Sequence, residues 1–394
     1  MNFDVALGQL VAELESGARP KGGASADTGE VMSLGAEHLA DDGSFSFKNP
    51  KRIPKEFYEK LPGGRVSPGD ILIVKDGATT GKTSFVNDDF PFHEAAINEH
   101  VFRLSVKPHE ADSKYIFRYL ASPRGKHEIL KDFRGATVGG IGRSFVETVF
   151  VPLPPLDEQR RIAAILDKAD ALRRKRKRAI ELIDEALLSV FLERFGDPVV
   201  NPKSWRQAPI SHVCKVVTGN TPPRENSENF GSFIEWIKSD NINPEEQYVS
   251  EAAERLSEAA KSKARIAPRG SILITCIAGS PNSIGNAALT DREVSFNQQI
   301  NALISTDIDV LFLYHQIRAG KRLIQNASTG GMKGLVSKSR LEQVLVMCPP
   351  SDLQRKFSCI ASKFTSQKAE QRNSLSKSEA LFFSLQHRAF SGQL

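Results

Sequence analysis

The feature that most constrains this chain is an internal duplication. The stretch "VPLPPLDEQRRI" at 151–162 returns as "VMCPPSDLQRKF" at 346–357. Both read as an apolar run, a Pro-Pro pair, an acidic residue, and then Gln with a basic residue after it. Upstream, "GDILIVKDGATTGKTSFV" at 69–86 is matched by "GSILITCIAGSPNSIGNAAL" at 270–289. Repetition over this length predicts two copies of one fold in a single chain.

Each copy ends in a long helical pattern. Apolar residues recur every three or four positions over about 156–195, after Pro154-Pro155 and before Gly196. A second such pattern covers about 351–390, and it opens with the capping-box order Ser-Asp-Leu-Gln. An amphipathic helix of this length cannot cover its apolar stripe alone. The sequence therefore predicts that the two helices pack on each other in antiparallel orientation, which relates the two copies by a pseudo-two-fold axis.

The remainder of each copy mixes short strand-like runs with turns and one helical stretch. "HVFRLSV" and "INALIST" are typical of strands, whereas 113–130 and 309–325 are typical of helices. Because regular strand–helix–strand repeats are too few for a doubly wound sheet, we predict an α+β fold. The predicted boundaries are a first domain at 1–152, a central helix at 153–196, a second domain at 197–348 and a C-terminal helix at 349–394.

The tripeptide Gly81-Lys82-Thr83 follows an apolar run and raises the question of a phosphate-binding loop. Such a loop needs a glycine five residues before its second glycine, where this sequence has Asp76. The matched copy has Ile284-Gly285-Asn286 in place of Thr-Gly-Lys. The pattern therefore predicts a glycine-dependent turn between two strands rather than a nucleotide site.

Composition and charge exclude several classes of protein. The chain has 394 residues, 40% of them hydrophobic and 25% charged, with a net charge of +6, so any nucleic-acid contact must come from local clusters. The longest apolar runs are too short to span a bilayer, and no signal peptide is visible. The four cysteines form no CxxC pair. We therefore expect a cytoplasmic protein with no membrane association, no metal site and no cofactor.

The phrase "VPLPPLDEQRRIAAILDKADAL" and its echo at 346–367 resemble the specificity (S) subunits of type I restriction–modification systems, the HsdS family. "GDILIVKDGATTGK" is similar to a motif of the target-recognition domains of that family. The resemblance implies two target-recognition domains, each reading one half of a bipartite, asymmetric sequence in double-stranded DNA. They are joined by two long antiparallel coiled-coil helices, which set the spacer between the half-sites.

The resemblance also implies partners. An S subunit has no catalytic residues of its own, and the assembled complex supplies methyltransferase and ATP-dependent endonuclease activity. Two methyltransferase (M) subunits would dock on the helices, and restriction (R) subunits would join the full complex. The second copy, "CPPSDLQRKF", lacks the Leu-Asp-Glu of the first, which weakens the implication that both helix ends dock partners equally well. The predicted partner-binding residues are Leu156, Gln159, Ile162, Leu166, Gln354 and Phe357.

Basic residues gather before each Pro-Pro pair, beside the glycine-rich loops "RGATVGGIGRS" and "STGGMKGLVSKS". Such loops can approach a phosphate backbone closely, and their side chains can reach base edges. The alternative is a solvated basic face around a turn. The polar turns "NEH" (98–100) and "NQQ" (297–299) could also read bases. The predicted DNA-binding residues are Lys82, Arg118, Arg124, Lys126, Arg134, Thr137, Arg143, Ser144, Arg318, Lys321, Arg322, Thr329, Lys333, Lys338 and Arg340.

Two questions stay open at this level. The run "RRKRKR" at 173–178 wraps the whole circumference of a helix, so it is either solvated, or faces an acidic partner, or contacts spacer phosphates. The chain as a whole could instead be a stand-alone DNA-binding regulator or a helical scaffold without a methyltransferase partner. A regulator would bring a compact recognition-helix motif, which is not evident, and a scaffold would not explain two duplicated α+β units.

Overall fold

The computed structural model describes residues 3–25, 29–135, 139–329 and 334–394. The chain divides into two compact units. Unit 1 comprises residues 1–176 and 374–394, and unit 2 comprises residues 177–373. The order of elements in unit 2 repeats that in unit 1, as the internal duplication predicts.

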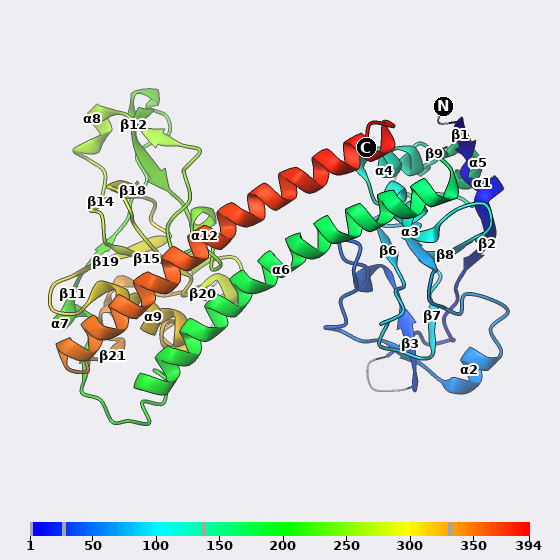
Figure 1. Ribbon diagram of the computed structural model, residues 1–394. Helices are drawn as coiled ribbons and strands as arrows, with labels where there is room; N and C mark the ends of the chain where they lie inside the picture. The colour runs from blue at the N-terminus through cyan, green and yellow to red at the C-terminus, as the bar shows by residue number, and fades with distance from the viewer. Residues whose placement is uncertain (1–2, 26–28, 136–138, 330–333) are drawn as a thin grey trace. The chain divides into compact units, whose positions relative to one another are not determined.

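Unit 1 is built on a four-stranded antiparallel sheet and a smaller three-stranded sheet (Figure 1). The four-stranded sheet has the order β2 (Val11–Ser16), β8 (Val101–Val106), β5 (Ile71–Val74), β6 (Thr83–Phe85). The smaller sheet has the order β4 (Arg52–Ile53), β3 (Val31–Leu34), β7 (Ala95–Ile97), with β3 and β7 parallel.

Unit 2 repeats both sheets. Its four-stranded sheet has the order β11 (Cys214–Thr218), β19 (Ile300–Ser305), β15 (Ile272–Thr275), β17 (Ala287–Leu289). The second sheet has the order β13 (Arg255–Leu256), β12 (Phe230–Ile237), β18 (Val294–Phe296), β14 (Ile266–Ala267), and β12 and β18 are parallel.

The central strands explain why these sheets form. β5 reads Ile-Leu-Ile-Val and β15 reads Ile-Leu-Ile-Thr, and every residue of both is buried. Alternate residues serve different cores: Ile71 and Ile73 pack on one side of the sheet, and Leu72 and Val74 on the other. A strand whose side chains alternate between two apolar environments reads as a nearly continuous apolar run rather than as an apolar–polar alternation.

Helices follow the strands in the same order in both units. The principal ones are α3 (Ser113–Leu120) and α4 (Pro123–Leu130) in unit 1, and α9 (Val310–Ala319) and α10 (Arg322–Asn326) in unit 2. The shorter elements of unit 1 are β1 (Phe3–Ala6), α1 (Leu7–Leu10), η1 (Ala36–His38), α2 (Lys55–Glu59), α5 (Phe145–Thr148) and β9 (Phe150–Leu153). Those of unit 2 are β10 (Gln207–Pro209), α7 (Ile210–Val213), η2 (Ser227–Asn229), η3 (Ser239–Asn241), α8 (Glu258–Lys261), β16 (Ile277–Ala278), η4 (Pro281–Ser283), β20 (Gly334–Leu335), α11 (Lys338–Glu342) and β21 (Leu345–Met347).

Two long helices, α6 (Leu156–Phe195) and α12 (Ser351–Phe390), have 40 residues each. In unit 1 the core takes Ile162 from the beginning of α6 and Phe390 from the end of α12. In unit 2 the ring of Phe191, near the end of α6, lies 5.3 Å from the ring of Phe357, near the beginning of α12. Early residues of each helix thus meet late residues of the other, which confirms the predicted antiparallel orientation. The predicted domain boundaries, which treat each helix as a separate domain, stay a prediction. In the structure, each helix contributes one half to each unit.

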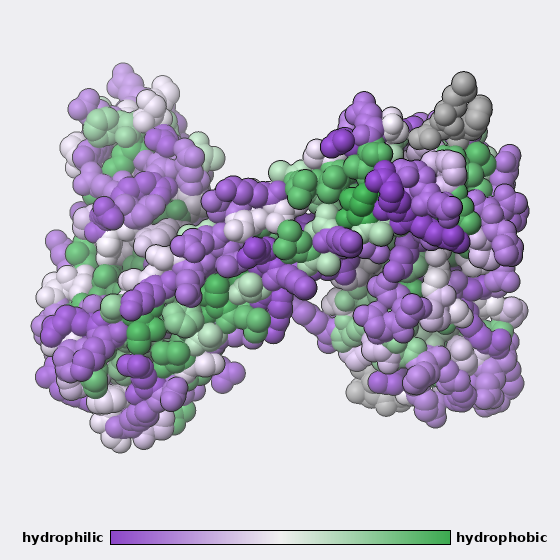
Figure 2. Space-filling view, viewed as in Figure 1, coloured by the Kyte–Doolittle hydropathy of each residue, from purple (hydrophilic) through white to green (hydrophobic). Residues whose placement is uncertain are grey.

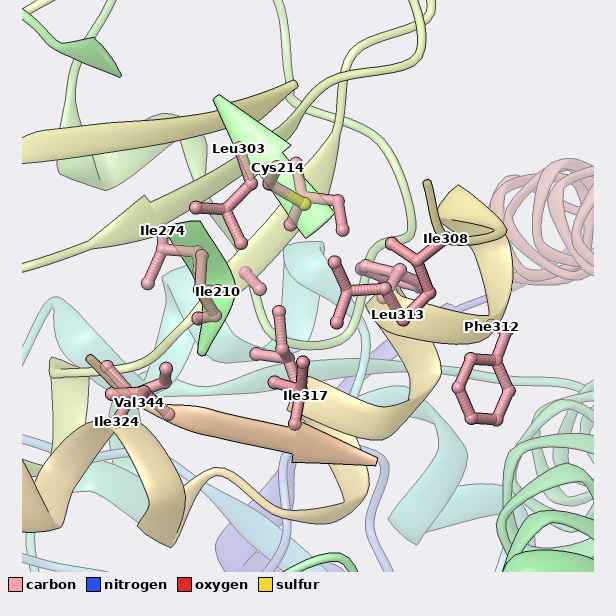
Figure 3. Packing of buried hydrophobic residues seen from close by; sticks show 14 of the residues in the cluster. Ile210, Cys214, Ile274, Leu303, Ile308, Phe312, Leu313, Ile317, Ile324 and Val344 are labelled. Carbon is pink, nitrogen blue, oxygen red and sulfur yellow. The ribbon is translucent and has the colours of Figure 1, made fainter. Parts of the chain in front are cut away.

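The core of unit 2 shows how a long helix joins its unit (Figure 3). Strand residues such as Ile274 and Leu303 face Leu313 and Ile317 of α9, and all four are fully buried. The ring of Phe312 continues this core to Phe191 of α6, with ring centroids 5.8 Å apart. Burying rings of this size is a large apolar contribution, so each helix half is fixed by its own unit.

The turn at Gly81 is the predicted glycine-dependent turn. Gly81 has a φ of +81°, and its N–H donates to the carbonyl oxygen of Val74 over 2.8 Å. The matched Gly285 also has a φ of +81° and donates to the carbonyl oxygen of Thr275 over 2.9 Å. Since side-chain-bearing residues are strained at this φ, the fold requires glycine here and not the lysine that follows it.

Candidate nucleic-acid interface

In unit 1, loops from four strands meet at one end of the sheets. Asn98 directly follows β7, and its N–H donates to the carbonyl oxygen of Leu34 at the end of β3 over 2.9 Å. The Asn98 side chain accepts from the N–H of His100 over 3.0 Å, and the carbonyl oxygen of His100 accepts from Lys75 over 2.9 Å. The turn 98–100 therefore lies between the ends of β3 and β5.

A glycine-rich loop lies beside this turn and contacts the end of β5. The N–H of Ile141 donates to the carbonyl oxygen of Lys75 over 2.7 Å, and Gly77 donates to the carbonyl oxygen of Gly139 over 3.2 Å. A Cβ at Gly140 would lie only 2.7 Å from the carbonyl oxygen of Lys75, so glycine permits this close approach. We call the assembly of 17–20, 75–77, 98–100, 134–135 and 139–142 the loop row of unit 1.

Unit 2 builds the same loop row. The N–H of Asn297 donates to the carbonyl oxygen of Ile237 over 3.0 Å, and its side chain accepts from Gln299 over 3.1 Å. The carbonyl oxygen of Gln299 accepts from Cys276 over 2.8 Å. β16 then pairs with β20, as 76 pairs with 140 in unit 1. The loop row of unit 2 is therefore 219–221, 276–279, 297–299 and the described residues around 329–336.

A matched pair of glycines seats the polar turn in each row. A Cβ at Gly17 would lie 1.8 Å from the carbonyl oxygen of Ile97, and a Cβ at Gly219 would lie 2.1 Å from that of Asn297. Neither position accepts a side chain without displacement of the backbone. The sequence already indicates that these two glycines correspond, because "ESGARP" at 15–20 aligns with "VTGNTP" at 217–222.

The two loop rows carry different polar groups. In unit 1, Arg19 pairs with Glu99 over 2.5 Å, and His100 Nδ1 lies 2.6 Å from Asp76 Oδ1. In unit 2, the groups in the same places are neutral. Ser239 Oγ lies 3.2 Å from Gln299 Oε1, Asn297 Nδ2 lies 3.0 Å from the same oxygen, and Thr221 bonds Gln298.

Three of the predicted DNA-binding residues of unit 1 flank its loop row. The buried carboxylate of Asp132 holds two of them, since it pairs with Arg134 over 2.8 Å and accepts from Ser144 Oγ over 3.1 Å. It also accepts from the N–H of Gly142 over 3.1 Å. Arg134, Arg143 and Ser144 are all exposed. Sequence reasoning missed Asp132, which organises the loop from inside. Thr137 lies outside the described residues.

The other predicted DNA-binding residues of unit 1 lie off the loop row. Arg118 is buried and paired with Asp167 and Asp170 of α6, over 2.7 and 3.0 Å, so it fastens α3 to the long helix. Lys82 pairs with Asp41 over 2.9 Å. Arg124 donates to the carbonyl oxygen of Phe390 over 2.9 Å, and Lys126 is exposed on α4.

In unit 2, the first two predicted residues are occupied within the chain. Lys321 Nζ donates to Asn282 and Asn286, each over 2.5 Å, and burial lowers the pKa of its ammonium. Arg318 donates to the carbonyl oxygen of Pro244 over 2.7 Å.

The remaining predicted residues of unit 2 lie near its loop row or are exposed. Thr329 donates to Leu335 over 3.3 Å, within the row. Arg322, Lys338 and Arg340 are exposed, and Lys333 lies outside the described residues.

The glutamines of the Pro-Pro motif have an internal role. Gln159, 1% exposed, donates to the carbonyl oxygen of Pro154 over 2.8 Å and accepts from the N–H of Asp112, the N-cap of α3, over 2.9 Å. Gln354 makes the same two bonds, to Pro349 over 2.7 Å and from Asp309 over 2.9 Å. The motif is thus a clamp between the start of a long helix and the helix that packs on it.

The other predicted partner-binding residues are also enclosed. Ile162, Leu166 and Phe357 belong to the cores of their own units, and Leu156 is half-buried. Partner binding at these six residues stays a prediction. The structure gives five of their side chains contacts inside the chain.

Exposed apolar side chains instead border a groove in each unit. Phe383 of α12 is 51% exposed and Leu188 of α6 is 46% exposed, and hydrophobic colour gathers over these parts of the two helices in Figure 2. The groove of unit 1, about 400 Å³, is lined by Ser122, Pro123, Arg124, Phe383, Gln386, His387, Phe390 and Ser391. The groove of unit 2, about 250 Å³, is lined by Asp184, Glu185, Leu187, Leu188, Phe191, His315, Arg318 and Ala319.

The family model described as the type I restriction modification DNA specificity domain matches residues 5–182 and again 202–377. The chain belongs to this family. Among curated relatives in the family, the HindI specificity subunit of Haemophilus influenzae is 24% identical over 182 residues, which cover 43% of this chain and 38% of that protein. The MjaVIII specificity subunit of Methanocaldococcus jannaschii is 27% identical over 149 residues, covering 38% of this chain and 33% of that protein. The chain thus spans little more than a third of these relatives.

Solved structures from the family share the fold along the whole chain. The S subunit from M. genitalium has a TM-score of 0.58 at 17% identity, covering 98% of this chain and 96% of that one. A chain from a structure on complex assembly and conformational transition of the type I R-M system has a TM-score of 0.55 at 17% identity, covering 100% and 98%. Within the described parts of the chain, no helix combines the length and hydropathy needed to cross a bilayer.

Proposed function

We propose that this chain is the DNA sequence-specificity subunit of a type I restriction–modification complex, without catalytic activity of its own. Each unit reads one half of a bipartite, asymmetric site, and α6 and α12 set the spacer. One observation carries the proposal: both units build the same loop row and furnish it with different polar groups. Two loop rows with the same backbone arrangement but different polar side chains suit two half-sites that differ in sequence.

Different side chains of the loop rows suit different parts of the DNA, the arginines its phosphates and the polar turns its bases. Arg134 and Arg143 are exposed beside glycine backbone, which allows them to meet phosphate oxygens and fix the register of the duplex. The polar turns 98–100 and 297–299 offer carboxylate, imidazole and amide groups, which suit base edges in the major groove. The chain binds and positions DNA, and it breaks or forms no covalent bond.

Partners are part of the proposal. We infer that two M subunits dock on the chain and that R subunits join the full complex, in the cytoplasm. The two apolar grooves lie in matched places, each between the helices that follow the main sheet and the second half of a long helix. Two matched grooves suit two copies of one partner, and the exposed Phe383 and Leu188 are better placed to meet it than the buried glutamines.

Co-expression with the M subunit of the same system tests this function. The expected result is a complex that elutes with two copies of M and methylates a split DNA sequence. A chain that elutes alone but binds DNA is a stand-alone regulator, and one that binds protein but no DNA is a scaffold; either result overturns the proposal. Phe383→Asp and Leu188→Asp should each release one M subunit, whereas Arg160→Ala, an exposed change outside both grooves, should release neither.

A further inference from the structure

Glu99 and Gln298 occupy the same position in the two loop rows. Each is the middle residue of the polar turn between matched strands, β7 and β8 in unit 1 and β18 and β19 in unit 2. The preceding Asn98 and Asn297 fix both turns by accepting from the N–H two residues later, over 3.0 and 3.1 Å. The two side chains are therefore presented from equivalent backbones.

Backbone hydrogen bonds and close glycine contacts also hold the two turns in place. Asn98 and Asn297 donate to the ends of β3 and β12, and Gly17 and Gly219 let the neighbouring strand approach the turn without a side chain between them. A group carried on such a frame keeps its place when a ligand arrives. Positions that discriminate between ligands need this kind of support.

Matched residues on the adjoining loop contact the two side chains. Arg19 Nε lies 2.5 Å from Glu99 Oε1, and Thr221, in the place of Arg19, donates to the Oε1 of Gln298. The second carboxylate oxygen of Glu99, Oε2, is enclosed and has no hydrogen-bond partner. The Glu99 side chain as a whole is 31% exposed, so a ligand that approaches the turn can reach the carboxylate.

We propose that Glu99 and Gln298 are specificity-determining residues for the two half-sites, an inference that rests on the proposed function. A carboxylate offers acceptors only, so Glu99 selects the exocyclic amino group of a cytosine. An amide offers one donor and one acceptor, so Gln298 selects adenine, whose N7 and N6 present the complementary pair. Each residue reads one base pair in the half-site of its own unit.

The test is a binding selection with the complex of full chain and M subunits on a library of randomised duplexes. Wild type, Glu99→Gln and Gln298→Glu are compared by sequencing the bound duplexes. Glu99→Gln should change the preferred base at one position of one half-site by about tenfold or more, and Gln298→Glu should do so in the other half-site only. Every other position should keep its base frequencies.

The matched controls are Glu94→Gln and Glu293→Gln, which directly precede β7 and β18 at the opposite ends of these strands and pair with Lys55 and Lys261. They should leave all base frequencies unchanged. A Glu99→Gln variant that melts like wild type, but weakens binding equally for all sequences or shifts no base, overturns the inference. A wild-type complex that selects no split sequence overturns the proposed function instead.

Discussion

At the scale of single residues, the buried imidazole of His315 gives a prediction about stability. His315 is 8% exposed, and its Nε2 has no hydrogen-bond partner. Burial, and then the nearby Arg318, lower the pKa of this imidazole to about 3 from an ordinary 6.5. Between these pH values the unfolded chain binds a proton that the folded chain does not. The contribution of His315 to stability is therefore present above pH 6.5 and is lost as the pH falls.

Urea unfolding of wild type and His315→Gln at pH 7.5 and pH 5 measures this. Protonation of the unfolded His315 should lower the free energy of unfolding of unit 2 by about 2 kcal/mol between these pH values, and the variant should not show that loss. Asp184 and Glu185, which line the same groove, are present in both proteins, so the comparison cancels them. Equal losses in the two proteins would contradict the prediction.

Gln159 and Gln354 give a second prediction. Replacing either by Leu leaves an enclosed backbone N–H and carbonyl oxygen without a partner, and should cost about 1–3 kcal/mol of stability. Thermal unfolding measures the cost, and the exposed neighbours Arg160→Ala and Arg355→Ala are the matched controls. If the Leu variants instead melt like wild type and lose the M subunit, these glutamines bind the partner, as the sequence alone predicts.

At the scale of elements, the turns at Gly81 and Gly285 can be compared directly. Gly81→Ala and Gly285→Ala should each destabilise their unit by about 1–2 kcal/mol, because both residues have a φ of +81°. Lys82→Ala removes an ion pair to an exposed carboxylate and should cost less than about 1 kcal/mol. Calorimetric unfolding of the three variants tests this. A larger effect of the lysine than of the glycines would reinstate a role for the Gly-Lys-Thr sequence.

The basic run at 173–178 on α6 is partly neutralised inside the chain. Arg173 and Arg174 pair with Asp170, and Arg178 pairs with Glu181 and Glu185, over 2.6 to 3.1 Å. In the assembled complex, Arg178→Ala should therefore leave the salt dependence of DNA affinity unchanged. Arg143→Ala, which removes an exposed arginine at a loop row, should flatten the log–log slope by nearly one. A flattened slope for Arg178→Ala would place this part of the run on phosphates.

Because the sequence is duplicated, its helices, strands and turns could be predicted from it. The ion pairs between these elements could not. Two α+β units, the long antiparallel helices and the glycine turn follow from repeated patterns in one chain. The role of Arg118 does not, because its partners Asp167 and Asp170 lie on α6 and only the folded unit brings them together. Asp132 was also missed, although its partners are close in sequence, because nothing in a lone acidic residue indicates that its carboxylate will be buried against a glycine loop.

At the scale of the whole molecule, the proposed function depends on two DNA-reading units in one chain. The family model matches twice, and the same row of loops recurs with different side chains. A chain with one reader and one inert copy would show the same duplication but would specify a single uninterrupted sequence. The two arrangements differ in what DNA they select and not in how they fold.

Mapping methylated adenines measures this difference most directly. The chain and its M subunit are expressed in a host without other adenine methyltransferases, and every modified adenine in the genome is located. Two short, unlike blocks of specified bases should flank a spacer of constant length, and the pattern should vanish when the chain is omitted. Modification at one continuous block, or the same modification without this chain, would contradict the account.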